Sequence, residues 1–410
     1  MLEGIKVVEL ATAIAAPAAG GILADWGADV VKVETGAGDP SRRGTAALMP
    51  DGVSAGYHLD NRGKRSVHVD LRSEEGRGAL LRLLRQADVF ITNRRPAVLK
   101  AARIDWDTIK AENPRLVYAS VTGYGLEGPD ANLPAYDVAA FWSRGGVASL
   151  LVPKGEDPFV LRTGIGDHTC SIATVSGILA ALVRRSTTGE GALVETSLLR
   201  SGVYAVGADL ATYLRLGRIK SNRKRKESIA PLVNFFKTRD GQWVCVMPRN
   251  GRVDWPNICN AAGRPDLIDD LRFRSDRRRQ ENVAELVEAF DEAFGALDYA
   301  EVAARLRALD VVFAPVQTPA QLAEDPQARA AGCFVELTDK NGDVFRSPAA
   351  PVRFPGLDRP LNTPAPERGQ HTAEVLGEAG YSTEEIEQVA QATARSRNKA
   401  PEEALVDTDM

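Results

Sequence analysis

The sequence predicts an α/β protein with a large parallel sheet and a second, smaller α+β domain. Apolar, strand-like runs alternate with helical patterns over the first half of the chain, which is typical of parallel strand–helix–strand units. From Pro231 onward the pattern changes to hairpin signals followed by amphipathic helices. At 410 residues the chain is also longer than one hydrophobic core usually supports, so we expect more than one domain.

The composition is that of a soluble globular protein. Hydrophobic residues make up 44% and charged residues 26% of the chain, and the formal net charge of -4 gives no reason to expect nucleic acid or an anionic membrane as a partner. No basic, apolar leader precedes the first strand, and we expect no apolar run long enough to span a bilayer. The cysteines are scattered without metal-ligand spacing, which favours a reduced, cytoplasmic protein without a metal: Cys170, Cys245, Cys259 and Cys333.

The first unit is strand, helix, strand. Ile5–Leu10 is a buried strand, Ile14–Trp26 a helix with Pro17 in its first turn, and Asp29–Glu34 the next strand. Small residues over Ala15–Gly21 let the backbone approach another group closely. Plain packing of the helix on the sheet explains this smallness as well as a bound phosphate or pantetheine does, so both interpretations stay open.

Basic residues recur beside the elements that follow. The sequence predicts a strand over Ser66–Asp70, an amphipathic helix over Ser73–Gln86 and a strand over Asp88–Thr92. Ligands of open α/β sheets bind at the carboxyl ends of the strands, so these cations are candidates for an anion site, although a solvated basic rim is the alternative. They are Arg62, Lys64, Arg65, Arg72, Arg94 and Arg95.

Gly123–Gly128 matches G-x-G-x-x-G directly after a predicted strand, Leu116–Thr122. A dinucleotide site requires a helix to open at this point, so that its N-terminus holds the pyrophosphate. Here Pro129 and Pro134 predict a loop instead, which argues against a nicotinamide or flavin site. A glycine loop bordering an active site remains an option.

A single carboxylate, Asp167, lies where a long helix begins. Gly164 and Gly166 precede it, and the residues after it place one apolar face at spacings of three and four: Ile172, Val175, Ile178, Leu179 and Leu182. The pattern predicts Asp167 as the N-cap of this helix, and capping alone is enough to explain an aspartate there.

The remaining elements complete two domains. We expect a helical stretch from Ala135 to Trp142, a strand over Gly191–Ser197, a helix over Ser201–Leu216 and an exposed basic linker over Arg218–Lys226. Later elements are listed in order: a hairpin around Arg239-Asp240-Gly241, helices near Trp255–Ala262, Glu281–Phe294 and Ala300–Leu309, a strand over Val311–Gln317, a second hairpin turning at Asn341-Gly342, and a final helix with a Ser382/Glu385 capping box.

The order of these motifs resembles the class III (CaiB/BaiF-type) CoA-transferases, a family related to formyl-CoA transferase and alpha-methylacyl-CoA racemase. The matching segments run almost end to end: Leu2–Val7, Ala15–Pro17, Leu23–Glu34, Gly38–Pro40, Asn61–Ser66, Asp70–Leu71, Ala87–Val89 through Asn93, Asn113–Leu116, Gly123–Gly125, Ala135–Asp137, Gly369–Thr372 and Glu374–Leu376.

The resemblance implies a function and a set of site residues. It implies that Asp167 is the nucleophile, that an acyl-CoA and a carboxylic acid are the substrates, and that coenzyme A is a substrate, with no permanently bound cofactor and no metal. The implied contacts to coenzyme A are Ile14, Ala15, Val69, Leu71, Arg72, Asn93, Arg94, Arg95, Lys100 and Tyr136. Thr35 and Ala101 stand where some members carry arginines toward the nucleotide, and Lys32, Lys100 or Arg103 are candidate substitutes.

It also implies an architecture: a Rossmann-like large domain built from both chain ends, a smaller α+β domain, and ring-shaped subunits that interlock in a homodimer. The expected bounds are 1–200 and 351–395 for the large domain, 226–325 for the small one, 201–225 and 326–350 for linkers, and 396–410 for a disordered tail.

Two alternative functions remain. A racemase of the same superfamily has a histidine directly before the position of Asp137, but this chain has Tyr136, and a phenol with an ordinary pKa near 10 is a poor base for an α-proton. A CoA-binding protein without catalysis would keep the basic strand ends and would not need Asp167.

Overall fold

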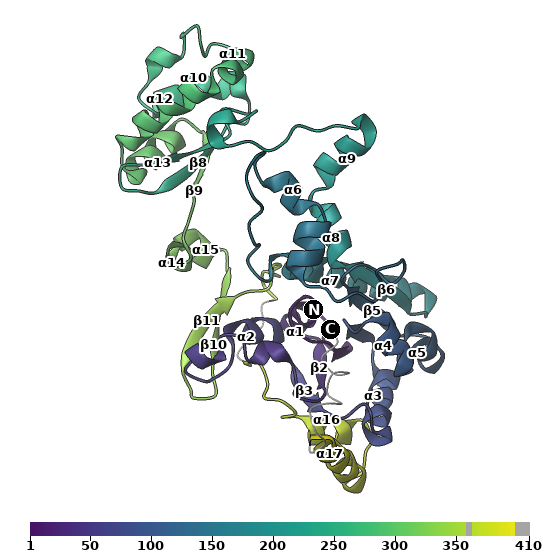
Figure 1. Cartoon of the computed structure of the whole chain (residues 1–410). Coiled ribbons are helices and arrows are strands. Elements are labelled where there is room, and N and C mark those ends of the chain that lie inside the picture. Colours follow the sequence, from purple (N-terminus) through teal and green to yellow (C-terminus); the bar gives the residue numbers. More distant parts are fainter. Residues whose placement is uncertain (358–362, 398–410) are drawn as a thin grey trace. The chain divides into compact units, whose positions relative to one another are not determined.

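The computed structural model describes residues 1–357 and 363–397, so the predicted tail lies outside the described residues from residue 398 on. The chain divides into two compact units (Figure 1). The larger unit comprises Met1–Ala148, Val160–Ala211 and the chain from Ala330, and the smaller unit comprises Ser149–Phe159 and Thr212–Arg329.

Six parallel strands form the sheet of the larger unit, within its described residues, in the order β3-β2-β1-β4-β5-β6. They are β1 (Lys6–Leu10), β2 (Asp29–Glu34), β3 (Arg65–His68), β4 (Val89–Thr92), β5 (Val117–Thr122) and β6 (Ala192–Ser197). The order reverses between β1 and β4, and in doubly wound sheets the carboxyl ends of the strands at such a switch point border the ligand crevice.

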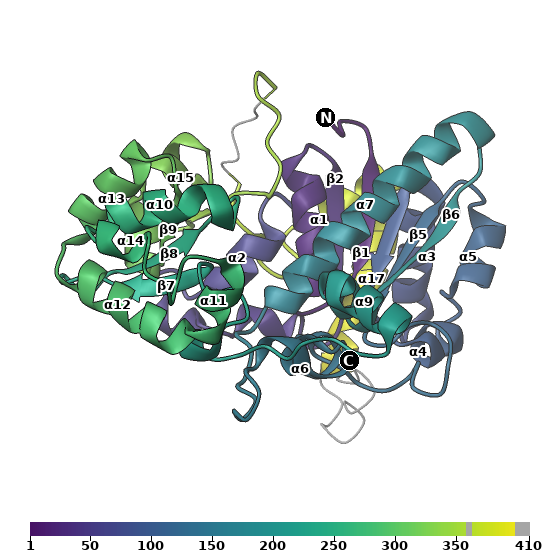
Figure 2. The same ribbon diagram turned by 90° about the horizontal axis from the view of Figure 1, so that it is seen from above.

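Helices cover both faces of this sheet. On one face α1 (Ala15–Asp25) lies beside α7 (Ile165–Thr188), as Figure 2 shows. On the other face α3 (Glu74–Gln86) packs with the C-terminal helices α16 (Thr372–Glu378) and α17 (Thr383–Arg397). One hydrophobic cluster joins residues near the two ends of the chain, so the larger unit is built from both ends, as the family resemblance implies.

By length and composition, α7 is the one helix of the described residues that is long and apolar enough to cross a membrane. The expectation that no apolar run reaches that length is therefore wrong. Here α7 packs against α1, β5 and β6. The apolar run is explained by this contact with the sheet and with a neighbouring helix.

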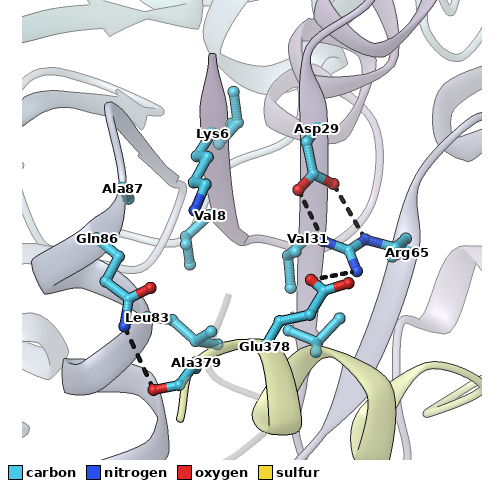
Figure 3. Close-up of a pocket in the computed structure, with 12 residues that line it drawn as sticks. Lys6, Val8, Asp29, Val31, Arg65, Leu83, Gln86, Ala87, Glu378 and Ala379 are labelled. Carbon is cyan, nitrogen blue, oxygen red and sulfur yellow. Dashed lines mark hydrogen bonds and ion pairs between the residues drawn. The ribbon is translucent and has the colours of Figure 1, made fainter. Parts of the chain in front are cut away.

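Arg65, the first residue of β3, ties the two chain ends together. Its guanidinium donates to Asp29 on β2 at 3.0 and 2.7 Å and to Glu378 on α16 at 2.8 Å (Figure 3). It also donates to Glu374 on α16 at 2.9 Å. The final helix begins with the predicted capping box, because Ser382 N–H donates to the Glu385 carboxylate and Glu385 N–H donates to the Ser382 hydroxyl.

The smaller unit has its own sheet and core. β7 (Asn234–Lys237), β8 (Trp243–Met247) and β9 (Val312–Pro315) pair antiparallel, and the predicted Arg239-Asp240-Gly241 turn joins the first two, with Gly241 at a φ of 87°. Its main helices are α10 (Gly251–Ala261), α11 (Asp276–Glu281), α12 (Val283–Gly295) and α13 (Tyr299–Ala308). Aromatic side chains dominate the cluster between helices and sheet, among them Phe236, Trp255, Phe290 and Phe294.

One stretch that the sequence predicts as a single helix forms two helices in the structure. The stretch predicted as Ser201–Leu216 consists of α8 (Leu198–Ala205) and α9 (Gly207–Leu216). The first starts early because the Ser197 side chain accepts a hydrogen bond from Arg200 N–H and so caps it.

The other elements are α2 (Ala55–Asn61), α4 (Pro96–Ala101), α5 (Trp106–Glu112), a π-helix (Val138–Arg144), α6 (Val147–Leu151), α14 (Pro319–Glu324), α15 (Pro326–Ala330), β10 (Phe334–Thr338), β11 (Val344–Pro348) and 3-10 turns at Pro40–Arg42, Ala46–Leu48, Arg225–Glu227 and Pro265–Leu267.

Candidate active site

The start of α7 sets the geometry of the candidate site. Gly164 is the N-cap in a left-handed conformation, with a φ of 94°, and Asp167 is the third residue of the helix. The prediction of Asp167 as N-cap is therefore wrong, because Gly164 takes that place and donates its N–H to Asp137 Oδ2 at 2.9 Å. In the first turn, Asp167 still lies close to the unpaired amides and the positive end of the helix dipole.

Gly166 allows the π-helix Val138–Arg144 to pack closely on the first turn of α7. A Cβ at this position would lie 2.7 Å from Cγ of Phe141, a distance that real Cβ atoms do not show. Only glycine therefore allows the π-helix Val138–Arg144 to pack directly on the backbone of α7. This contact fixes Asp137, the N-cap of the π-helix, beside the start of α7.

Charged side chains gather around Asp167. Asp137 is buried, and Asp60, at the end of α2, is buried and bonds Nε2 of His168 through Oδ1 at 3.0 Å. Burial, together with the charges of Asp137 and Asp60, raises the pKa of Asp167 to about 7, and the charge of His168 opposes this rise. The hydrogen bond to Asp60 raises the pKa of His168 above 6.5, although burial works against it. Burial likewise raises the pKa of Asp60.

A pocket opens in front of Asp167, within the larger unit. Five of the predicted site residues line it, namely Ala15, Asn93, Arg95, Tyr136 and Asp167. The other lining residues are mostly apolar or small: Pro96, Val121, Thr122, Gly123, Ala131, Leu133, Ala135 and Leu198. Asn93 follows β4 and cross-links to the β1–α1 turn, accepting from Thr12 N–H at 3.2 Å and donating to Thr12 O at 2.8 Å.

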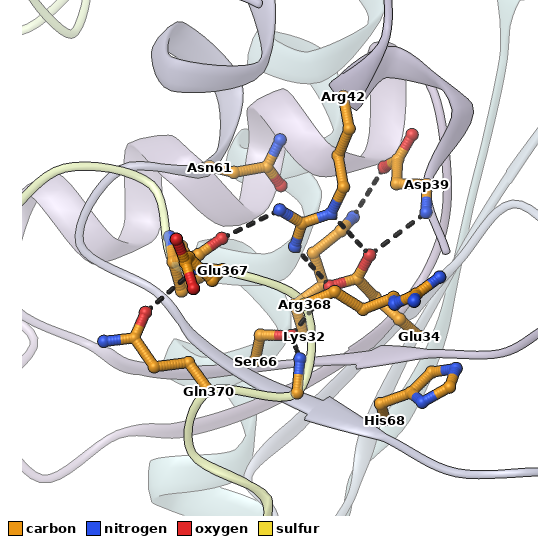
Figure 4. Close-up of polar contacts among 12 residues, drawn as sticks. Lys32, Glu34, Asp39, Arg42, Asn61, Ser66, His68, Glu367, Arg368 and Gln370 are labelled. Atoms are coloured by element: carbon orange, nitrogen blue, oxygen red, sulfur yellow. Dashed lines mark hydrogen bonds and ion pairs between the residues drawn. The ribbon is translucent and has the colours of Figure 1, made fainter. Parts of the chain in front are cut away.

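Asp39 holds the β1–α1 turn through hydrogen bonds and an ion pair. Its Oδ1 accepts from Ala13 N–H at 3.1 Å and from Ser41 N–H at 2.9 Å, while Oδ2 pairs with Lys32 at 2.9 Å. Ala13 has a φ of 65°, in the left-handed region that alanine avoids. Lys32 also donates to Glu9, and the surrounding polar contacts, including those of Glu34, Arg42 and Ser66, are drawn in Figure 4.

The remaining predicted coenzyme A contacts do not line this pocket. Ile14 is the N-cap of α1 and lies near Gly164. Val69 is buried in the hydrophobic cluster, with Leu71 packed against it, so their side chains face the core. Arg72 pairs with Asp70 at 3.0 Å. Arg94 is buried with its guanidinium 3.5 Å from the Thr35 hydroxyl, and Lys100 is exposed on α4.

The structure separates the basic residues that were grouped as one candidate anion site. Arg62, Lys64 and Arg65 precede or begin β3, whereas ligands bind at the carboxyl ends of strands. Arg62 is buried against Asp25, and Lys64 is buried against Glu9 at 2.7 Å. Lys32 is also fully buried between Glu9 and Asp39, so it does not substitute for an arginine at Thr35 or Ala101.

The glycine-rich segment is a loop, as predicted. No helix begins between Gly123 and Gly128, and the loop is pinned because Leu126 N–H donates to the Glu195 carboxylate at 2.8 Å. A dinucleotide pyrophosphate has no helix N-terminus there. Among the residues that the structure describes, no group of three or more His, Cys, Asp or Glu is arranged to hold a metal ion.

Three residues of the charged cluster were not predicted as site residues. Asp137 lies in the Ala135-Tyr136-Asp137 motif, which gave a signal for the segment but not for the carboxylate. His168 is adjacent to Asp167 in the sequence, whereas Asp60 is 107 positions away and gives no local signal. The packing of α2 against α1 brings Asp60 to the site.

Comparison with known proteins identifies relatives over the whole length. The sequence model described as CoA-transferase family III matches residues 2–372. The chain is 34% identical to (R)-2-hydroxy-4-methylpentanoate CoA-transferase of Clostridioides difficile, covering 94% of this chain and 97% of the relative. It is 34% identical to cinnamoyl-CoA:phenyllactate CoA-transferase of Clostridium sporogenes, over 95% and 96% of the two chains. The crystal structure of a CaiB/BaiF family protein from Brucella suis superposes with a TM-score of 0.81, at 30% identity, over 92% of this chain and 98% of that one.

Proposed function

The chain belongs to CoA-transferase family III and is a CoA-transferase enzyme, and we propose that it moves coenzyme A from an acyl-CoA to a free carboxylic acid with Asp167 as nucleophile. The observation that carries the proposal is the position of Asp167. It is a single partly buried carboxylate at the start of a helix, and it lines a pocket that also contains Ala15, Asn93 and Tyr136.

Four bond exchanges complete the reaction. The Asp167 carboxylate attacks the thioester carbonyl, the C–S bond breaks, and an acyl-aspartyl anhydride and coenzyme A thiolate result. The thiolate attacks the aspartyl carbonyl, which releases the first acid and leaves an aspartyl-CoA thioester. The acceptor carboxylate attacks this thioester, the C–S bond breaks, and a second anhydride and coenzyme A thiolate result. The thiolate then attacks the acyl carbonyl of that anhydride, giving the new acyl-CoA and regenerating Asp167.

The local structure supports this chemistry in two ways. A carboxylate with a pKa of about 7 is more basic than an ordinary aspartate, so its ionised form is a stronger nucleophile. The free amides of the first turn of α7 supply donors for an oxyanion at the reacting carbonyl. The implied coenzyme A contacts that lie outside the pocket, such as Arg72 and Arg94, remain part of the proposal for the nucleotide end.

The apolar lining favours an apolar acyl chain. Val121, Leu133 and Leu198 contribute hydrocarbon to the pocket. One relative at 34% identity is named for (R)-2-hydroxy-4-methylpentanoate, a branched 2-hydroxy acid, and the other for cinnamoyl-CoA and phenyllactate, which carry aromatic groups. All of these acyl groups have an apolar side chain. A panel of thioester donors and free acids should therefore begin with branched and aromatic 2-hydroxy acids and include succinate as a polar comparison.

The assembly belongs to the same proposal. We infer an interlocked homodimer of ring-shaped subunits in the cytoplasm, with domain bounds at 1–200 and 351–395 for the large domain, 226–325 for the small domain, and 201–225 and 326–350 for linkers. Sedimentation at micromolar concentration tests the dimer, which a monomer would contradict.

The nucleophile is tested by substitution and by trapping. Asp167→Ala should abolish coenzyme A exchange while binding of coenzyme A changes only a few-fold, and Asp209→Ala, at an exposed position of α9, is the matched control. Hydroxylamine added during turnover, followed by peptide mass mapping, should mark Asp167. Unchanged turnover in the Asp167 variant would refute the mechanism, and exchange of the α-hydrogen of the substrate without transfer would favour the racemase.

A further inference from the structure

The proposed bond exchanges leave one ionisable pair beside the nucleophile without a role. His168 follows Asp167 on α7, and its Nε2 lies 3.0 Å from Oδ1 of Asp60. The Asp60 side chain is only 5% exposed, whereas that of His168 is 42% exposed. A histidine that only filled the core would be buried, but this ring has one nitrogen at a buried carboxylate and a substantial part of its surface exposed.

The ring also lies beside the N-cap of the helix. A Cβ on Gly164 would lie 3.4 Å from Cε1 and 3.5 Å from Nδ1 of His168, so the ring is separated from this glycine by about the width of a methyl group. Asp137 accepts the N–H of the same glycine. The contact with Asp60 therefore holds the imidazole beside the first turn of α7, where Asp167 lies.

The charges that act on Asp167 are unbalanced without His168. Asp137 at the π-helix and Asp60 on α2 are both acidic and both disfavour an ionised Asp167, as burial does. The basic groups nearest to Asp60, Lys64 and Arg62, are committed to Glu9 and Asp25. Other helices and strands against α7 add the neutral polar contacts of Cys170 with Thr196, and Glu195 of β6 is hydrogen-bonded to the loop at Leu126. His168 is the group that opposes the two acidic neighbours.

We propose that His168, oriented by Asp60, is a positioning residue that keeps Asp167 in its anionic, nucleophilic form. The proposal rests on the function proposed above for Asp167. Burial makes the carboxylate a strong nucleophile but also favours its protonation, and a protonated carboxyl cannot attack a thioester. The imidazolium preserves the anion at neutral pH without a covalent role of its own. The Asp60 carboxylate keeps the imidazole protonated.

The test is the pH profile of kcat/KM, measured with the donor and acid pair of highest turnover from the panel. The wild-type acid limb should lie near pH 7, the value for Asp167. His168→Gln should move that limb up by about one pH unit, so that the rate falls about tenfold at pH 6 and converges with the wild type by pH 9. His168→Lys, which retains a cation, should leave the limb at or below its wild-type position.

Two further variants separate this role from a structural one. Asp60→Asn should move the limb less than His168→Gln does, because the imidazolium loses its partner and deprotonates at lower pH while Asp167 also loses an acidic neighbour that disfavours its ionisation. Thr169→Ala, next on the same helix with its hydroxyl bonded to Ile165 O, should leave the profile unchanged. A loss in His168→Gln that is equal at pH 6 and pH 9, or a profile identical to the wild type, overturns the proposal.

A measurement without turnover covers the case in which these variants do not fold. Charge coupling is reciprocal, so removing the Asp167 charge must lower the pKa of His168. The chain has 4 histidines, and the ring signals can be titrated by NMR in the wild type and in Asp167→Asn. A fall of about one unit supports the proposal, and an unchanged His168 titration refutes it. Hydroxylamine labelling of Asp167 in the wild type distinguishes this failure from a failure of the proposed function, in which Asp167 is not labelled.

Discussion

The buried carboxylate of Asp137 accepts the N–H of Gly164 at 2.9 Å and thereby determines where α7 begins. The same carboxylate lies close enough to Asp167 for its charge to raise the pKa of that group. One residue therefore fixes both the geometry of the candidate nucleophile and its protonation. These two effects can be separated by substitution.

Asp137→Asn should separate them, because the amide oxygen can still accept from Gly164 while the charge is lost. We expect the acid limb of the rate profile to move to lower pH, since the pKa of Asp167 falls when the Asp137 charge is removed. Asp137→Ala also removes the acceptor and should lower the free energy of unfolding by about 1–3 kcal/mol. Urea unfolding and the pH dependence of kcat/KM measure the two outcomes, and equal stability of the two variants would contradict the hydrogen-bond role.

Gly166→Ala should damage the site through packing alone. The new Cβ would meet Cγ of Phe141 at 2.7 Å, so either α7 or the π-helix must move. Overpacking of this kind costs about 1–3 kcal/mol, and the displacement should lower kcat more than it weakens binding of coenzyme A. Gly207→Ala is the matched control, because a Cβ there meets nothing within 4 Å. Equal thermal midpoints for the two variants would show that the close contact is not a constraint.

Asp167 should destabilise the folded protein above neutral pH. Its pKa rises from 3.8 to about 7 on folding, chiefly through burial. Between these values the folded state binds more protons than the unfolded state, so the contribution of this carboxyl to stability is present at low pH and is lost as the pH rises toward 7. Above pH 7 the ionised group costs up to about 4 kcal/mol.

Asp167→Asn should therefore be more stable than the wild type at pH 8, by several degrees in Tm, with the difference shrinking as the pH falls toward 4. Thermal unfolding at intervals across this range measures the trend. A constant difference at all pH values would indicate a packing effect of the amide rather than the raised pKa.

The sequence predicted the fold of the larger unit well because its signals are local. Buried strands such as Val89–Thr92 and Val117–Thr122 carry continuous apolar runs, and Gly63 marks the turn before β3. In the smaller unit, Gly241 marks the hairpin turn between β7 and β8 in the same way. The helix N-terminus at Ile165 was displaced because it depends on a bond from Gly164 to Asp137, 27 residues earlier, which no local pattern reveals.

The candidate site was predicted only in part for the same physical reason. Asp167 and Tyr136 lie in recognisable motifs, and both line the pocket. Arg62 and Lys64 were grouped with the anion-site candidates because sequence alone does not tell whether a lysine or arginine has a buried carboxylate opposite it. Lys64 meets Glu9, 55 residues away, and Asp60 meets His168, 108 residues away. Such pairs exist only once α1, α2 and the sheet have packed.

Arg72 and Arg65 should differ in their effect on coenzyme A. Arg72 lies beyond the carboxyl end of β3 with a partly exposed side chain, which we propose for the nucleotide end of coenzyme A, whereas Arg65 lies at the amino end and is held by Asp29 and Glu378. Arg72→Gln should raise the KM for acyl-CoA about tenfold, the effect of one lost charged hydrogen bond. Arg65→Gln should change KM less than about twofold and stability by about 1 kcal/mol or less. Similar KM values for both variants would contradict the assignment of coenzyme A binding to Arg72, at the carboxyl end of β3, rather than to Arg65, at its amino end.

The strain at Ala13 yields the last prediction. Its φ of 65° is held by the bond from its N–H to Asp39, and the turn leads directly to Ile14 and Ala15. A left-handed alanine costs about 1–2 kcal/mol, which glycine avoids, while the greater freedom of glycine in the unfolded chain costs about 0.5–1 kcal/mol. Ala13→Gly should therefore leave the free energy of unfolding unchanged or raise it slightly.

Ala16→Gly is the control for this substitution, because Ala16 is fully buried in the regular helix α1 and should lose about 1 kcal/mol or more. Since glycine also lets the turn sample other conformations, Ala13→Gly should raise the KM for acyl-CoA although the protein is as stable as the wild type. Urea unfolding together with steady-state kinetics gives both quantities. If Ala13→Gly were as destabilising as Ala16→Gly, the turn at Ala13 would not be strained.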